Sequence, residues 1–307
     1  MFQFVLYRVL QAVPVLFVII TMTFFMARLA PGGPFTQERT LAPQVLDAMN
    51  EKYGLNDPWH IQYFRYLGSL MKGDLGPSFS SPGRSVNEVI ANKIPVSIEL
   101  GSLALIFSLV LGVPCGMIAA LQRNRPLDYV PMTAAMIGIC LPTFVLGPLL
   151  SLCFGVWLGW FNVSGWFDFS DRVLPAVTLG LPYAAYIARL TRGSMLGVLS
   201  LDYIRTARAK GVPERKVILK HAIRGGMTPV ISYLGPAFAG LLAGSFVVEK
   251  IFVIPGLGSA FVEGAINRDY TLVMGTVIFY SVLLLVMNIV VDFVLVLLNP
   301  RLKFETA

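Results

Sequence analysis

Few residues in this chain stand at spacings that enzymes use for chemistry. Ser69 and Lys72 match the Ser-x-x-Lys spacing of a serine nucleophile with a lysine base, but the companion motifs of that class are missing. The sequence also has no His-Glu-x-x-His zinc motif, no Walker A loop and no Gly-x-Ser-x-Gly elbow. We therefore expect a chain that is not an enzyme.

The three cysteines and two histidines do not suggest a metal site or a disulfide. Cys115, Cys140 and Cys153 lie inside apolar stretches, with no second cysteine or histidine at ligand spacing. His60 and His221 fall on opposite sides of the membrane in the topology predicted below, so they cannot act together. We expect inert thiols, no bound metal and no cofactor in this chain.

Two polar residues lie inside an otherwise apolar stretch near the C-terminus. Asn288 and Asp292 are four residues apart and so share one face of a helix. Polar groups inside a bilayer are costly, and one interpretation is that they line or gate a pathway. The alternative, which the pattern favours, is a hydrogen bond between helices or a contact with a cation near the cytoplasmic side.

The stretch 202–216 combines a small-residue face with a cluster of basic side chains. Ile204, Ala207 and Gly211 recur on one face of a helix. Gly211 predicts the end of this helix and Pro213 the start of a second one. The basic side chains off the small face are Arg205, Arg208 and Arg215. Such a short helix–turn–helix fits a groove in a partner protein, but the pattern equally permits a basic loop that only fixes topology.

The elements that position these residues are membrane spans. The chain has 307 residues, of which 56% are hydrophobic and 13% charged, and its mean hydropathy is +0.71. Soluble domains carry about 25% charged residues, so lipid must be part of the solvent of this chain. A helix needs about 20 apolar residues to span about 30 Å of hydrocarbon. Six uncharged runs reach or nearly reach this length: 9–27, 100–121, 129–161, 173–188, 227–248 and 270–291.

These runs predict an all-α membrane protein with six transmembrane helices. The third run is too long for one straight helix and contains Pro131, Pro142 and Pro148, which predicts kinks or a re-entrant end. The fourth is short and is expected to continue past Arg189, whose side chain can reach the interface.

The distribution of basic residues predicts the orientation of these spans. With a cytoplasmic N-terminus, the inside segments hold Arg8, Arg123, Arg125 and the basic cluster of 189–226, whereas the short outside loops hold few cations. Both termini are then cytoplasmic. The net charge of +7 is explained by this sorting, without any nucleic acid.

This topology divides the chain into four segments. They are a first transmembrane helix (1–30), a periplasmic segment (31–95), a five-helix core (96–299) that includes the cytoplasmic loop 189–226, and a cytoplasmic tail (300–307). Within the periplasmic segment, turn residues flank two stretches of helical spacing, 43–53 and 59–71.

The stretch 203–211 also carries a family resemblance. Ala207-x-x-x-Gly211 with its flanks resembles the EAA loop of binding-protein-dependent ABC importer permeases. Arg205-Thr206 stand where the general pattern has Glu-Ala, and this form is typical of the oligopeptide, dipeptide and nickel branch. Further stretches that resemble this branch, in order, are 28–32, 53–58, 73–78, 188–195, 255–258 and 267–270. Residues 34–36 and 38–41 resemble the B-type subunits of oligopeptide permeases.

The resemblance implies a type I ABC importer permease fold with a periplasmic insertion between helices 1 and 2, in the bacterial inner membrane. It implies four kinds of partner: a second, C-type permease subunit, two cytosolic ATPases that hold ATP and Mg, a periplasmic peptide-binding protein and the peptide cargo. It also implies that the loop 203–216 docks on an ATPase. The residues it assigns to this coupling are Tyr203, Arg205, Thr206, Ala207, Arg208, Gly211, Glu214 and Arg215.

Three alternatives remain open at this point. The cargo of such a permease could be a dipeptide, nickel or another solute instead of an oligopeptide. The second alternative is a secondary carrier that works alone, but carriers usually show inverted repeats, and we find no internal repeat in the sequence. The third is a membrane scaffold or sensor without transport.

Overall fold

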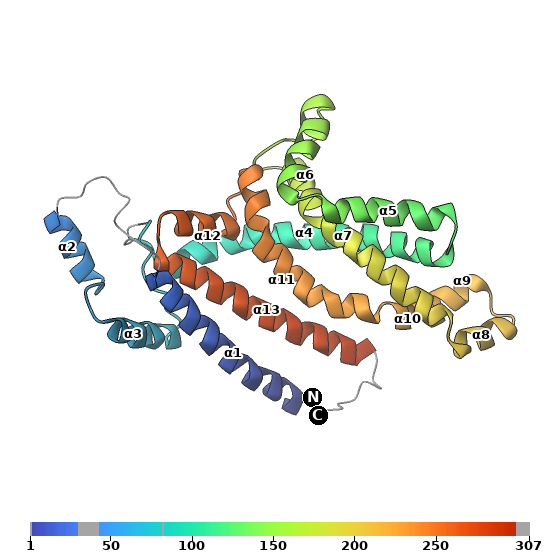
Figure 1. The fold of residues 1–307 in the computed structure, drawn as a ribbon, viewed down its shortest axis with the longest axis horizontal. Helices are drawn as coiled ribbons and strands as arrows, with labels where there is room; N and C mark the ends of the chain where they lie inside the picture. The colour runs from blue at the N-terminus through green and yellow to red at the C-terminus, as the bar shows by residue number, and fades with distance from the viewer. Residues whose placement is uncertain (1, 30–42, 82, 299–307) are drawn as a thin grey trace. The chain divides into compact units, whose positions relative to one another are not determined.

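The computed structural model describes residues 2–29, 43–81 and 83–298, and this part of the chain is almost entirely helical (Figure 1). Within it, the single β-type pairing is an isolated bridge between Pro77 and Ser85. The predicted tail at 300–307 and the family-like stretches 34–36 and 38–41 lie outside the described residues.

Five helices are long and apolar enough to cross a membrane, and a bent pair supplies a sixth candidate span. The five are α1 (Phe2–Leu29), α4 (Val86–Leu121), α7 (Phe169–Leu199), α11 (Thr228–Ile251) and α13 (Tyr270–Leu298). The bent pair is α5 (Pro126–Cys140) followed by α6 (Thr143–Leu150) and the π-helical turn η1 (Ser151–Trp157).

The bend confirms the break predicted in the third span. The chain turns by 108° between α5 and α6. Leu141 is extended and Pro142 follows it, as expected for a residue whose successor is proline. The fourth span also continues past Arg189, as predicted, because α7 ends at Leu199.

The shorter helices lie between these spans. The two helices predicted between the first two spans are present as α2 (Pro43–Lys52) and α3 (Trp59–Met71). The basic stretch forms α8 (Asp202–Ala209), α9 (Glu214–Lys216), the π-helical turn η2 (Val217–Ala222) and α10 (Ile223–Gly226). The last short helix is α12 (Leu257–Ile266), which precedes α13.

The chain divides into two compact units, which are described separately. Unit 1 comprises Met1–Ser97 and Pro255–Leu283, and unit 2 comprises Ile98–Ile254 and Leu284–Ala307. One unit boundary therefore falls inside α4 and another inside α13.

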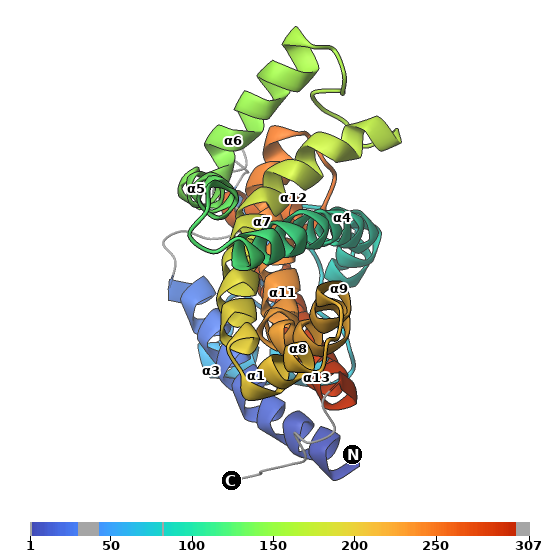
Figure 2. The ribbon, with the colours of Figure 1, turned by 90° about the vertical axis from the view of Figure 1, so that its right-hand side faces the viewer.

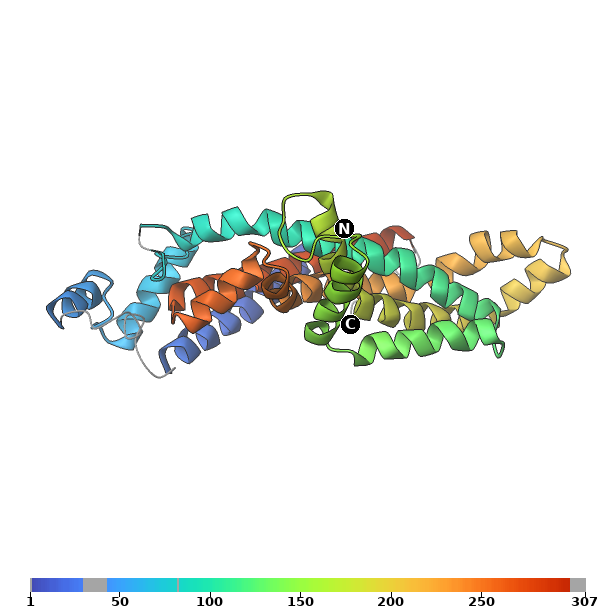
Figure 3. The same cartoon turned by 90° about the horizontal axis from the view of Figure 1, so that it is seen from above.

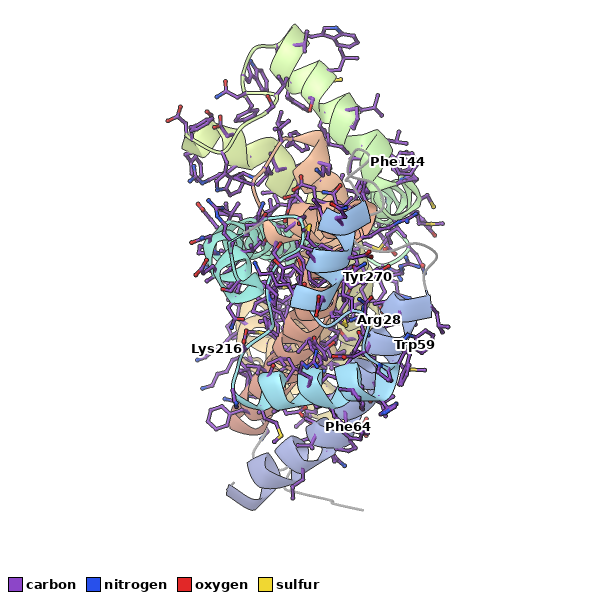
Figure 4. The ribbon with its side chains drawn as sticks, turned by 90° about the vertical axis from the view of Figure 1, so that its left-hand side faces the viewer. Arg28, Trp59, Phe64, Phe144, Lys216 and Tyr270 are labelled. Atoms are coloured by element: carbon purple, nitrogen blue, oxygen red, sulfur yellow. The ribbon has the colours of Figure 1, made fainter. Side chains whose placement is uncertain are left out.

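Unit 1 has an aromatic core. The rings of Phe24 (α1) and Tyr66 (α3) stack at 6.0 Å, and both residues are buried in one cluster with Phe79 and Tyr270. The guanidinium group of Arg28 lies 5.5 Å from the centre of the Tyr270 ring (Figure 4). These contacts join α1, α3, the turn at 77–81 and the start of α13.

A buried carboxylate links two distant segments of unit 1. Asp269, with no exposed surface, accepts hydrogen bonds from the Ser78 hydroxyl (2.6 Å) and from the backbone N–H (2.8 Å) and hydroxyl (2.7 Å) of Ser80. It also caps α13 by accepting the N–H of Leu272 at 3.0 Å. Asp269 therefore fixes the 78–80 turn to the N-terminus of α13.

Unit 2 is built around α7, which packs against α5 and α11 (Figure 2). Glycines allow α4 to approach α7 closely: a β-carbon at Gly116 would meet the carbonyl oxygen of Ala188, and one at Gly180 would meet that of Ala104 at 2.6 Å. The Ser108 hydroxyl donates to the Gly180 carbonyl at 2.7 Å across the same contact.

Candidate functional site

The basic stretch after α7 forms a short helix with one buried face. In α8, Ile204 and Ala207 are buried in a cluster with Met195 of α7 and Val217 and Ala222 of η2. Ile204 and Ala207 lie three residues apart, so they share the face of α8 that turns toward this cluster. The helix is therefore attached to α7 by apolar packing.

The C-terminus of α8 is closed by a complete Schellman motif. Gly211 has a φ of +74°, which an L side chain rarely adopts. Its N–H donates to the carbonyl of Arg208 at 2.9 Å, and the N–H of Val212 donates to that of Ala207 at 3.2 Å. Pro213 follows, and α9 begins at Glu214, so the stop and restart predicted from Gly211 and Pro213 are confirmed.

An ion pair bridges the turn between α8 and α9. The Arg208 guanidinium donates to both carboxylate oxygens of Glu214, at 3.1 Å from Nε and 2.6 Å from Nη2. The hydrogen bonds from Arg208 hold the pKa of Glu214 below its usual range. Two parallel bonds fix the direction of both side chains, and the turn is held at both its backbone and its side chains.

The opposite face of α8 is exposed and charged. Tyr203 is 47% exposed, and its hydroxyl lies 3.4 Å from the carbonyl oxygen of His221. Arg205 lies 3.6 Å from Asp202, and its side chain is 71% exposed. The Thr206 hydroxyl donates to the Asp202 carbonyl, and Arg215 is also exposed. This face of α8 is therefore polar and open to solvent in this chain.

The short helix α10, which leads into α11, also contacts α7. The Ser194 hydroxyl donates to the carbonyl of Gly226 at 2.6 Å. A β-carbon at Gly226 would meet the sulfur of Met195, so a larger residue there would require the Met195 side chain to move. Together with the apolar cluster, these contacts hold α8, η2 and α10 as one body on the end of α7.

An ion pair that the sequence did not predict joins α5 to the same end of α7. Arg192 donates to both oxygens of Asp128, at 2.5 Å from Nε and 2.7 Å from Nη2. Asp128 is 1% exposed and also accepts the N–H of Asn124 at 3.0 Å. The two residues are 64 positions apart, so no local signal pointed to this pair.

Two family models together match almost the whole chain. Residues 112–304 match the binding-protein-dependent transport system inner membrane component, and residues 1–101 match the N-terminal model of the same membrane component. The chain belongs to this permease family. It is a multi-pass membrane component of an ABC transport system and not a catalytic subunit.

The relatives of this permease match over nearly their full length. The oligopeptide transport system permease protein OppB of Escherichia coli strain K12 is 48% identical and covers 99% of this chain and 100% of its own. The dipeptide transport system permease protein DppB of Bacillus subtilis strain 168 is 46% identical over 94% of each chain.

A solved structure supports the fold of the permease. The inward-facing MetNI methionine ABC transporter is similar at a TM-score of 0.60, with 16% identity, over 69% of this chain and 96% of that one. This confirms the predicted ABC importer permease fold.

Ala207 is buried within this chain, whereas the sequence suggested that it contacts a partner. The small face was expected to fit into a partner's groove, but Ile204 and Ala207 pack inside this chain because α7 and η2 cover them. Gly211 is exposed, and a β-carbon there would meet nothing within 4 Å. The structure thus separates two roles along α8: one face positions the helix, and the other is open.

The polar pair of the last helix lies on one side of α13. Asn288 faces α11, since a β-carbon at Gly235 would lie 3.2 Å from its Oδ1. Asp292 is half-buried one turn later. Whether this pair lines a pathway stays a prediction. In the described part of the permease, no group of three or more His, Cys, Asp or Glu gathers as a metal site.

Proposed function

We propose that this chain is the permease subunit of an ATP-driven importer of oligopeptides, and that it forms half of the translocation pathway. Identity of 48% over the full length of an oligopeptide permease supports this cargo. The dipeptide permease of Bacillus subtilis is 46% identical, so a dipeptide is the second candidate cargo. In both cases the chain moves solute and leaves ATP hydrolysis to other subunits.

The proposed contact with a cytosolic ATPase is the exposed face of α8 together with the turn to α9. The observation that carries this proposal is the rigid attachment of α8 to α7 through the buried cluster of Ile204, Ala207 and Met195. A helix that transmits motion must move with the span it follows, and an apolar cluster provides that connection. Tyr203, Arg205, Thr206, Arg208, Gly211, Glu214 and Arg215 form the proposed contact region, with Ala207 positioning it.

The remaining assembly follows from the same proposal. A second, C-type permease subunit completes the pathway, two ATPases bind ATP and Mg, and a periplasmic binding protein delivers peptide. The chain lies in the bacterial inner membrane with both termini in the cytoplasm. The 31–95 segment then faces the periplasm, and 189–226 faces the cytoplasm.

The mechanism requires two packings of the helix bundle that differ by a few kcal/mol and are biased by ATPase closure. Closure of the ATPases would move α8, and the cluster under it would transmit that movement to α7. The Arg192–Asp128 pair would then carry it to α5. Each link is a contact between named side chains, so each can be broken separately.

Charge reversal on the exposed face tests the proposal. In the reconstituted complex, Arg205→Glu should uncouple ATP hydrolysis from peptide uptake at least tenfold while the chain stays in the membrane. The control is Lys220→Glu, the same charge change on the exposed surface of η2 outside the 203–216 contact. Normal uptake in Arg205→Glu, or equal losses in both variants, would remove α8 as the coupling element.

A further inference from the structure

The chain carries an apolar projection that the proposed coupling mechanism does not use. After α5, the chain bends by 108° and continues as α6 and η1, then returns through residues 158–168 to α7. We call residues 143–168 the arm. Figure 1 shows it projecting from unit 2 across the direction of α5, and Figure 3 shows its green helix foreshortened from above.

The base of the arm packs against the rest of unit 2. Leu146 and Gly147 are buried, and a β-carbon at Gly147 would lie 3.4 Å from Ile251 and Phe252 of the α11 end. Farther out, every residue from Val156 to Trp160 is exposed. These five residues include the last two of η1 and the first three of the return, and the Phe154 ring of η1 contacts the Trp160 ring at 5.8 Å. The tip of the arm is therefore an exposed apolar surface that the arm itself covers on one side only.

The composition of the arm is that of a membrane–water interface. No charged residue occurs between Asp128 and Asp168, and three of the four tryptophans of the chain, at 157, 160 and 166, lie in this segment. Trp157 is 72% exposed and Phe167 is 90% exposed. Tryptophan concentrates where the headgroups meet the hydrocarbon, because its ring is apolar and its N–H is polar.

The geometry places the arm at that depth. The 15 residues of α5 span about 22 Å at 1.5 Å per residue, which is less than the ~30 Å of hydrocarbon. Starting at the basic residues Arg123 and Arg125, α5 therefore ends in the far part of the bilayer. The 108° bend then sends α6 and η1 close to the membrane plane.

The backbone of the return loop also requires the interface. Within residues 158–168, the N–H groups of Leu158, Trp160 and Phe161 donate to carbonyls of η1, and that of Gly165 donates to the Phe252 carbonyl at 2.9 Å. The N–H groups of Phe167 and Asp168 donate to the Asp171 carboxylate. The segment is otherwise irregular, and exposed irregular backbone is not tolerated in the hydrocarbon itself. At the interface, water and headgroups satisfy its remaining polar groups.

From these observations we propose that the arm is a membrane-interface anchor, whose aromatic tip contacts phospholipid on the side opposite to the 189–226 segment. Its apolar surface continues the exposed surface of α5 at Val130, Met136 and Ile137. The absence of any charged residue from 129 to 167 and the three tryptophans favour a phospholipid interface as the occupant. The inference rests on the chain spanning a membrane, and not on its cargo or its ATPase contact.

Photo-crosslinking in the assembled complex tests this inference. We would place benzoylphenylalanine at Trp157 and, separately, at Phe167, with Phe252, which has no exposed surface, as the matched control. After irradiation in membranes, the main product at 157 and 167 should be the chain plus the mass of one phospholipid, joined near the headgroup end of the acyl chain. The control should give no lipid adduct.

Other outcomes overturn the inference. A main product that joins position 157 or 167 to a second permease subunit, or to another copy of this chain, would assign the arm to a protein interface. Adducts at the methyl end of the acyl chains would place it in the bilayer centre. Neither readout depends on peptide transport, so failure here is distinct from failure of the proposed function.

Discussion

Arg192 and Asp128 form a two-point ion pair that holds the start of α5 against the end of α7, with N–O distances of 2.5 and 2.7 Å. Asp128 is almost completely buried, whereas the Arg192 side chain is 29% exposed. Since Arg192 lies two residues before Ser194, which binds Gly226, the pair sits next to the attachment of α8. It therefore connects the proposed ATPase contact to a second span.

We expect Asp128→Asn to destabilise the assembled permease by about 1.5–3 kcal/mol, the range for hydrogen bonds to charged groups. The physical reason is that Arg192 keeps its charge and loses its counterion in a largely buried place. Thermal unfolding of the purified complex in detergent measures the loss. As a control, Arg65→Gln breaks the exposed Arg65–Asp57 pair and should cost less than about 1 kcal/mol. Equal losses would contradict the argument from burial.

Sequence reasoning succeeded where a single residue dictates backbone geometry. Pro131, Pro142 and Pro148 together predicted a break in the third run, and it falls at Pro142, whereas the other two lie inside α5 and α6. Gly211 with Pro213 predicted the end of α8 and the start of α9, because glycine and proline act locally. The six candidate spans followed from hydropathy alone.

Sequence reasoning failed where the partner lies far along the chain. Asp128 pairs with Arg192, 64 residues away, and Asp269 accepts a hydrogen bond from Ser78, 191 residues away. No short-range sequence pattern indicates either contact. The spacing of Ile204 and Ala207 identified a packing face, but it did not tell whether this chain or a partner covers that face.

Gly211 is expected to matter for its backbone and not for its size. Its φ is +74°, and the space around its missing β-carbon is open. Gly211→Val should strain the turn by roughly 1–2 kcal/mol and lower coupled uptake, whereas Gly211→Asn should retain it, since asparagine tolerates this conformation. The ratio of ATP hydrolysed to peptide imported is the measurement. If Asn fails as completely as Val, Gly211 must be small for a contact with a partner.

The Asp269 cluster predicts a loss of stability in acid. Burial alone would raise the pKa of Asp269, but hydrogen bonds from Ser78, Ser80 and Leu272 outweigh it and the pKa is lowered. A lowered pKa stabilises the fold above the unfolded value of about 3.9, and this contribution disappears as pH falls through the folded value. Unfolding followed from pH 7 to 3 should show it.

The matched variant for this acid effect is Asp269→Asn. It should be less stable than the natural chain at pH 7, because it loses the charge-assisted bonds to the 78–80 turn. The difference between the two proteins should shrink below about pH 4. A constant difference from pH 7 to 3 would show that the Asp269 carboxylate does not account for the acid sensitivity.

The contact between α4 and α7 predicts opposite effects for two Gly→Ala changes. A β-carbon at Gly116 would meet the Ala188 carbonyl and lie 2.7 Å from Cβ of Thr191, so both helices must move apart. Gly116→Ala should therefore lower the thermal stability of the complex, by an amount in the range of about 1–3 kcal/mol for overpacking. At Gly193 of α7 nothing lies within 4 Å, and alanine there should be neutral or stabilising by up to about 1 kcal/mol through helix propensity. Thermal unfolding of both variants separates the two cases, because helix propensity alone predicts that Gly116→Ala is stabilising as well.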